Sequence, residues 1–449
     1  MPYTAPTLAQ AQAALANRLN DTSDVHWVAA ELTVYLREAL RTWNAWTSHW
    51  HDRGTLTCVP AQAFYDLTTD LSGSLRAQTV TNWELIADLQ YALLEPAAAG
   101  GTWTGTDQFN LAQLTTALQR RIDQFLRETG CQQTRAALPF VATASGRIAL
   151  AESVLIVRRA AGLPGAAASA ANQWNRPLLR EDDWGASSFL PSWRTPSDQV
   201  RAYSVSDTPP LDLQLIPPPA VDGTLDLVSI NKSATIDELV SAVIAIPDDW
   251  AWVIKWGALA DLLSGDGLAL DPARAAYCEA RWQQGIDQCV RTPVVLNAYR
   301  STTTMLTAAL AEADKFSPTW QLVPAVPRKL LLAGQNLVAS WPPPGIAGGP
   351  FTLTLDVVRN APVPSAGGDI LQISADVYDT ILDYAQHLAL FKQGPGELEL
   401  AQGLLDRVAR AAGIELQLQQ ANVPERAAQT RQQAQDGDAV PREQVAVPT

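Results

Sequence analysis

Apolar residues recur at helical spacing along the first fifty residues of the chain. Leu8, Leu15 and Leu19 form one stripe, which the polar run Asn20–Asp24 interrupts. From Val25 the apolar residues return at steps of three and four, and this pattern predicts a helix of about 26 residues. Its apolar face consists of Val28, Leu32, Tyr35, Leu36, Ala39, Trp43, Trp46 and Trp50.

Strand and helix patterns alternate in the next hundred residues. Two runs at 55–59 and 64–67, joined by Pro60–Ala63, predict a β-hairpin. Two amphipathic helices are predicted at 83–94 and 111–126, because apolar residues recur there with a helical period. Residues 1–150 are therefore predicted to form a mainly helical domain with a β-hairpin near 55–67.

Four segments then recur in the same order about 127 residues later. They are a Pro-x-Trp turn, a proline triplet, a strand-like run around Thr-Leu-Asp, and a helical run that follows an Asp. A shared order at nearly constant spacing indicates an internal duplication. The pairs are Leu190–Trp193 with Ser317–Trp320, Leu215–Pro219 with Ser340–Pro344, Thr224–Val228 with Thr354–Val358, and the helical runs from Asp248 and Asp376.

Each copy is predicted to begin with a short strand and to continue through small sheets into helices. The strand starts are Val154–Val157 and Pro293–Leu296. Because proline cannot donate a ladder hydrogen bond, Pro217–Pro219 and Pro342–Pro344 are predicted to end strands at a sheet edge. The predicted fold class is α+β, with a helical N-terminal domain followed by two tandem repeats of a small β-sheet plus helices.

The predicted domain boundaries follow from these patterns. The helical domain covers 1–150, the first α+β repeat 151–290 and the second 291–421. Residues 422–449 are rich in Gln, Arg, Asp, Pro and Ala, which predicts a flexible C-terminal tail. The alternative for this tail is ordering on a neighbouring subunit.

Composition narrows the function classes. The formal net charge of -14 argues against a surface that binds nucleic acid, although an acidic channel would let a duplex slide without sticking. An acidic surface that only confers solubility is the alternative. With no apolar run of membrane-spanning length and no signal-peptide pattern, we expect a protein kept in the cytosol unless it is packaged. The four cysteines lack CxxC spacing and are expected to be free, buried thiols.

The residues that could carry chemistry do not form a known constellation. The four histidines show no metal-ligand spacing, and no dinucleotide, phosphate-loop or nucleophile-elbow motif occurs. Acidic clusters at Glu181–Asp183 and Asp248–Asp249, with a surface rich in tryptophan, leave a glycosidase as one alternative. In the structural alternative, Asp248 and Asp376 cap the helices that follow them. No catalytic residue, metal or cofactor is therefore predicted.

Three segments together resemble the head-to-tail adaptor (neck or connector) proteins of tailed bacteriophages, especially those of short-tailed virions. The run Leu8–Trp50 resembles that family's opening helix pair, Leu190–Pro218 its central β part, and the element from Ile246 onward its closing helix. The resemblance covers about half of the chain. It implies a non-enzymatic virion protein that forms a ring, commonly of twelve subunits, below the portal.

The partners that this resemblance implies are further copies of the chain, the portal protein and downstream tail, nozzle or fibre proteins. DNA would pass through the lumen only as non-specific cargo, and assembly would take place in the host bacterial cytoplasm without a membrane. The predicted interface residues are the exposed parts of five tryptophans. These tryptophans are Trp43, Trp46, Trp50, Trp193 and Trp320.

The alternative functions are another tail component, such as a tail-tube or fibre-attachment protein, and a carbohydrate-binding or carbohydrate-degrading virion protein.

Overall fold

The computed structural model has the predicted α+β class. Its described residues contain ten α-helices and fourteen strands in three sheets. The predicted tail 422–449 lies outside these residues. The described ranges are 4–23, 25–60, 62–93, 108–143, 145–163, 177–197, 199–206, 211–237, 240–266, 269–318, 320–345 and 351–414.

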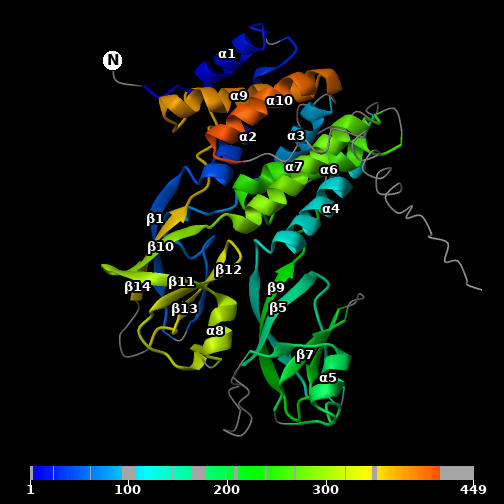
Figure 1. Cartoon of the computed structure of the whole chain (residues 1–449), viewed down its shortest axis with the longest axis vertical. Helices are drawn as coiled ribbons and strands as arrows, with labels where there is room; N and C mark the ends of the chain where they lie inside the picture. The colour runs from blue at the N-terminus through cyan, green and yellow to red at the C-terminus, as the bar shows by residue number, and fades with distance from the viewer. Residues whose placement is uncertain are drawn as a thin grey trace, which may run out of the picture.

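Eight helices form a continuous layer along one end of the molecule (Figure 1). Their apolar faces share one core, which is why helices far apart in sequence pack side by side. The four predicted N-terminal helices are all present, but they do not form a separate domain, since they pack with helices from the rest of the chain. The helices are α1 (Leu8–Arg18), α2 (Ala29–Thr47), α3 (Asn82–Ala92), α4 (Leu111–Thr129), α6 (Ala251–Leu263), α7 (Pro272–Arg291), α9 (Ala375–Phe391) and α10 (Pro395–Ala411).

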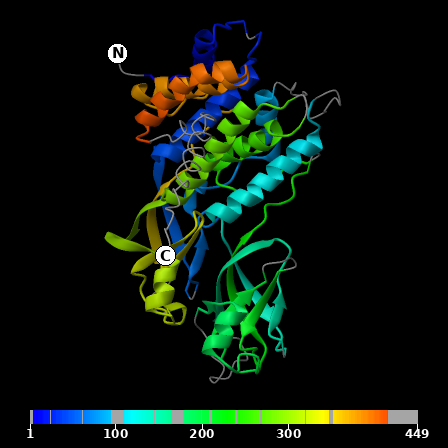
Figure 2. The ribbon, with the colours of Figure 1, turned by 45° about the vertical axis from the view of Figure 1, so that its right-hand side comes forward.

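Two β lobes extend from the helical layer and remain distinct after a 45° turn (Figure 2). The first lobe holds a seven-stranded sheet in the order β1-β14-β10-β11-β12-β13-β2, covered in part by α8 (Leu310–Phe316). Its strands are β1 (His51–Cys58), β2 (Phe64–Asp66), β10 (Val295–Arg300), β11 (Thr303–Ala309), β12 (Lys329–Ala333), β13 (Leu337–Trp341) and β14 (Phe351–Val358).

The second lobe holds a three-stranded sheet in the order β3-β9-β5 and a four-stranded sheet in the order β4-β8-β7-β6. Helix α5 (Asp183–Phe189) belongs to this lobe. Its strands are β3 (Thr134–Phe140), β4 (Arg147–Ala149), β5 (Val154–Leu163), β6 (Leu179–Arg180), β7 (Ala202–Val205), β8 (Asp212–Ile216) and β9 (Gly223–Asn231).

The two lobes have the same order of strands. We define unit A as α1, α2, β1, β2 and everything from β10 to α10, and unit B as everything from α3 to α7. The sheet order β1-β14-β10 in unit A corresponds to β3-β9-β5 in unit B, and β11-β12-β13-β2 corresponds to β6-β7-β8-β4. In each unit one strand pair is parallel, namely β11 with β12 and β6 with β7, and the neighbouring pairs are antiparallel.

Local details also correspond between the units. Trp193 and Trp320 each donate from the indole N–H to the residue six positions earlier, over 3.0 and 2.9 Å. Helices α2 and α4 both have 19 residues and both end in a left-handed cap residue. Thr7 and Thr81 each cap an 11-residue helix and bridge to a residue ahead of α9 and α6, respectively.

The strand pairing does not follow the predicted domain boundaries. Unit B stands in the sequence between β2 and β10 of unit A, so that strands from the predicted domain 1–150 complete both lobes. The predicted β-hairpin at 55–67 is wrong, because β1 pairs with β14 and β2 with β13 at opposite ends of the sheet. The proline triplets do end β8 and β13, but these strands lie inside their sheets rather than at an edge.

Candidate functional site

The contact between the two units buries charged and polar side chains, and we call it the inner interface. Among the helices it holds an ion pair between Lys255 of α6 and Glu38 of α2, with side chains only 3% and 4% exposed. Arg41 of α2 donates to Glu84 of α3 over 2.7 Å. Asn44 donates to the Asp249 carboxylate over 2.6 Å. Buried ion pairs of this kind require close partners, since each charge has lost its water.

A fully buried arginine lies at the centre of the inner interface. Arg281 of α7 donates to the Tyr384 hydroxyl of α9 over 2.7 Å. Its guanidinium lies over the rings of Trp46 and Trp252, at 5.2 and 4.8 Å from their centroids. Because the aromatic faces are electron-rich, they stabilise this cation in a site that excludes water. The side chains come from both units, so the cluster joins them.

A histidine and a tyrosine join the same helices nearby. The Nε2 atom of His387 lies 2.6 Å from the Tyr277 hydroxyl, and Nδ1 lies 3.0 Å from the Ala401 carbonyl. A carbonyl only accepts, so Nδ1 carries the proton and Nε2 accepts from the tyrosine. Burial, and then the charge of Arg281, lower the pKa of His387 to about 3. The imidazole is therefore neutral in the folded protein at ordinary pH.

This histidine predicts a loss of stability in acid. The pKa of the imidazole in the unfolded chain is ~6.5. As the pH falls from this value towards 3, the unfolded chain therefore binds a proton at His387 that the folded chain does not bind. We expect the unfolding free energy of the wild type to fall by about 2.5 kcal/mol more than that of His387→Gln between pH 7 and 4.5. Urea unfolding of both proteins at each pH measures this difference.

The wild type is compared with His387→Gln because a second buried group, Asp249, also changes the stability in this pH range. Burial raises the pKa of Asp249 to about 6, so the folded chain binds a proton there that the unfolded chain does not, and this favours folding as the pH falls below 6. Both proteins retain Asp249, and its effect cancels in the difference. Equal pH dependence of the wild type and His387→Gln would contradict the assignment of the acid loss to His387.

The β lobes contribute a second part of the inner interface. Asp226 in the central strand of unit B is fully buried and accepts from Arg135, Arg159 and Gln321, the last of these from unit A. Arg159 also pairs with Asp314 of unit A over 2.6 Å. One ion pair, Arg159 with Asp314, and one hydrogen bond, from Gln321 to Asp226, therefore join the two lobes.

Like units contact each other here through unlike faces. We call the surface of unit A in this contact its front, and the surface of unit B its back. On α2 the front residue Glu38 is 4% exposed, whereas its counterpart on α4, Arg120, is 69% exposed; each is the tenth residue of its helix. On α6 the back residue Lys255 corresponds to Asp383 of α9, since Trp256 and Tyr384 share one register. Unit A thus does not cover the front of unit B, and unit B does not cover the back of unit A, where Asp383 is 17% exposed and pairs with Arg18 and Arg407 of unit A itself. We call these two faces open.

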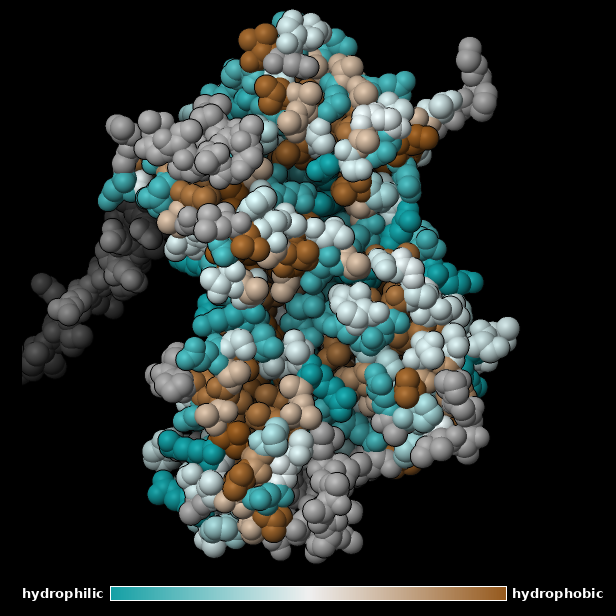
Figure 3. All heavy atoms as spheres, turned by 180° about the vertical axis from the view of Figure 1, so that it is seen from behind, coloured by the Kyte–Doolittle hydropathy of each residue, from teal (hydrophilic) through white to brown (hydrophobic). Residues whose placement is uncertain are grey.

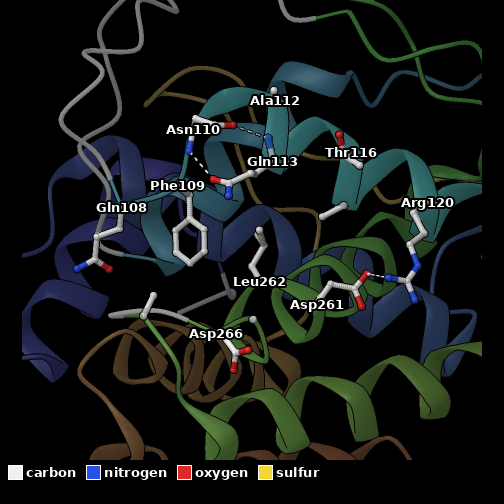
Figure 4. A pocket seen from close by; sticks show the side chains of 13 residues that line it. Gln108, Phe109, Asn110, Ala112, Gln113, Thr116, Arg120, Asp261, Leu262 and Asp266 are labelled. Atoms are coloured by element: carbon white, nitrogen blue, oxygen red, sulfur yellow. Dashed lines mark hydrogen bonds and ion pairs between the residues drawn. The ribbon is translucent and has the colours of Figure 1, made fainter.

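The open front of unit B is hollowed. A groove of about 640 Å³ lies between the N-terminal half of α4 and the end of α6. Phe109 and Leu262 form its apolar floor, and the paired Arg120 and Asp261 lie at one side (Figure 4). A second hollow of about 650 Å³ on the lobe of unit B is lined by polar side chains that include Arg147 and Gln214.

The five predicted interface tryptophans lie mainly in the core of the chain. Trp46 is half-buried at the inner interface, and the other four expose 7% or less of their surface. The exposed parts that the prediction relied on are therefore small, because each indole is covered by helices or strands of its own chain. Among the exposed tryptophans are Trp184 and Trp83. The four buried ones are Trp43, Trp50, Trp193 and Trp320.

Structural partners are present for three of the carboxylates considered for catalysis, namely Asp182, Asp248 and Asp249. Asp248 does not cap its own helix as predicted, but accepts from the backbone N–H groups of Thr79 and Val80. Asp182 caps α5 through the Gly185 N–H. Glu181 and Asp182 line the polar hollow of unit B, and no described residue that lines it is aromatic. Among its described lining residues, this hollow therefore does not combine carboxylates with the tryptophan-rich surface on which the glycosidase alternative rests.

Three further findings concern the candidate chemistry. The four cysteines are buried and free, as predicted. Within the described ranges, no three His, Cys, Asp or Glu side chains are placed to hold a metal ion. None of the described helices is both long and apolar enough to cross a bilayer.

No protein-family model matches the chain, and no match was found among curated proteins.

Proposed function

We propose that this chain is a non-enzymatic virion structural protein, a head-to-tail adaptor that forms a ring below the portal and joins capsid to tail around the DNA channel. The resemblance to adaptor proteins supports the proposal through Leu8–Trp50, Leu190–Pro218 and the element from Ile246. These segments form α1 with α2, the Pro-x-Trp turn with β7 and β8, and the start of α6. They lie in both units and on both sides of the inner interface.

The observation that carries the proposal is the contact of like units through unlike faces. Such a heterologous contact leaves one face of each partner uncovered. Each partner can therefore bind a further unit through that face. Repetition of the contact therefore produces a closed ring when the rotation between units divides a full turn. A ring-forming protein at the portal would need faces of this kind.

The charge of the chain suits the proposed channel. The formal net charge of -14 is compatible with an acidic lumen, which would repel the phosphates of DNA. DNA would then pass through without specific contacts, and no nucleic-acid partner would be bound in the mature particle.

Mass photometry of the purified protein, alone and mixed with portal protein from the same genome, tests this function. We expect a discrete ring, or a ring that appears when portal is added, because portal supplies a template for closure. A single-chain particle that ignores portal would contradict the adaptor proposal. A ring that binds tail proteins but not portal would instead indicate a tail-tube or fibre-attachment component.

A further inference from the structure

We infer that the chains of the assembly contact each other as units A and B do within one chain, so that the front of unit B receives the back of unit A from a second copy. This inference rests on the ring proposed above, but it does not depend on portal binding. It follows from the matching topology of the units and from the residues that stand at the two open faces.

The open faces lie on opposite sides of the molecule. Helix α4 of unit B lies at the right of Figure 1, whereas β1 and β14 of unit A lie at the left. The polar partners of Arg120 and Asp123 on α4 are in unit B itself, namely Asp261, Gln119 and Ser233. Their counterparts on α2, by contrast, bind unit B. The inner interface is therefore not a two-fold contact, and a second copy can extend it at either end.

Charges at the open faces match across the proposed contact. The inner ion pair of Glu38 with Lys255 has Arg120 and Asp383 as its counterparts, so both signs are exchanged and attraction is retained. Within the chain, Asp383 already pairs with Arg18 over 2.7 Å and with Arg407 over 3.6 Å, and the contact with Arg120 would add a further arginine to this group. Opposite charges placed in this way select one partner face over another.

A second counterpart pair lies in the lobes. Gln321 donates to the buried Asp226 over 3.1 Å within the chain. Each of these residues has a matched position, since Gln321 and Arg194 both follow the turn tryptophan, and Asp226 and Asp356 both occupy the Thr-Leu-Asp run of the central strand. Arg194 is exposed, and Asp356 lies on the back of unit A, where it is 18% exposed and pairs with Arg53 over 2.8 Å. The proposed contact would therefore bring an arginine to an aspartate.

The sheet surface of unit A at the inner interface is apolar, whereas the corresponding surface of unit B at the proposed contact between chains is polar. In unit A, Phe64, Ala339 and Leu331 lie side by side on three strands and are buried at the inner interface. At the same three positions unit B has Arg147, Gln214 and Ser204, which line the open polar hollow. An apolar contact is suited to permanent burial within one chain, and a polar one to a surface that stays soluble until assembly. The ring would then contain half as many chains as units.

Some apolar surface remains open on unit B. Seen from behind, apolar side chains gather on its lobe, beside the notch between the two lobes (Figure 3). Leu179 is 64% exposed, and its counterpart Leu306 in unit A is 67% exposed. Both residues occupy the first position of the parallel strand pair. They lie outside the counterpart pairs above, and we assign them no part in the contact.

Charge reversal at the open front tests the inference. Arg120→Glu and Arg194→Glu change exposed side chains, and we expect each to weaken chain-to-chain association at least tenfold in sedimentation experiments over a concentration series. Lys315→Glu is the matched control, because Lys315 is exposed on α8 beside the inner interface and belongs to neither open face. Its association should equal that of the wild type. The double variant Arg120→Glu/Asp383→Lys should recover most of the association that Arg120→Glu loses.

The outcomes separate the two proposals. Association unchanged by both Arg120→Glu and Arg194→Glu would overturn the inferred contact, while a ring that still binds portal would leave the adaptor function standing. Wild-type chains that remain single with and without portal would overturn both. Folding of each variant is checked by thermal unfolding, and a variant that melts as the wild type does reports on association alone.

Discussion

Replacing Lys255 by methionine is expected to lower the unfolding free energy by about 3–5 kcal/mol. The substitution leaves the Glu38 carboxyl group 4% exposed, without the partner that offsets the loss of its water. Asp88 lies close by, and burial raises its pKa well above the ordinary value, so this region already disfavours a second carboxylate charge. Chemical denaturation followed by tryptophan fluorescence measures the loss, since several tryptophans line the inner interface.

Two controls define the meaning of that result. The double variant Glu38→Leu/Lys255→Met should recover most of the stability, because a packed apolar pair can replace a buried ion pair at little cost. Lys329→Met removes the partner of Glu312 in a pair whose side chains are 31% and 39% exposed, and should cost less than about 1 kcal/mol. A loss below about 1 kcal/mol for Lys255→Met would refute the view that this pair holds the two units together.

Replacing Trp320 by alanine is the second large change, with an expected loss of about 3–5 kcal/mol. The indole is 1% exposed and packs beside Phe64 in the core of the first lobe. Its N–H donates to Asp314, which also pairs with Arg159 of unit B, so the substitution weakens both the lobe and the inner interface. Equilibrium unfolding and the assembly state of the remaining folded protein should be measured together.

The matched control is Trp184→Ala. Trp184 is 85% exposed, and its removal should change stability by less than about 0.5 kcal/mol. If Trp320→Ala remained as stable as the wild type and lost only its assembly, the tryptophan would be an interface residue, as its sequence pattern suggested. Loss of stability before loss of assembly would place it in the core.

The helices could be predicted from sequence more easily than their packing. The apolar stripe from Val28 to Trp50 correctly indicates a helix, which the structure places at Ala29–Thr47. The stripe has the same appearance whether its own chain or another chain covers it. The pattern therefore predicts a subunit contact for Trp43 and Trp50, whereas the same chain buries them.

The strands show a similar division. Local patterns locate β1 and β2, but the partner of each strand lies in the second half of the chain, with His51 opposite Val358 and Tyr65 opposite Val338. No local pattern encodes a pairing across so many residues, and a short proline-containing link made the hairpin the natural prediction. The prediction of tandem repeats has the same limit, because only segments with similar amino-acid sequences can be recognised as counterparts.

The residues of the inner interface were missed, although the sequence contains a signal for some of them. Lys255 stands alone in the apolar helical run Ala251–Ala260, where an unpaired charge would be costly. Such a position requires a buried partner, but the sequence does not say that the partner is Glu38, more than two hundred residues earlier. Arg281 and His387 gave no comparable signal, since their surroundings in the sequence are polar or mixed.

The most direct test of the account is a cryo-electron microscopy reconstruction of the assembled particle, with or without portal. We expect alternating units A and B around one ring, with Arg120 facing Asp383 of the next copy and the same rotation between neighbouring units within and between chains. A ring in which units A and B form separate tiers, or in which two copies meet through identical faces, would contradict it.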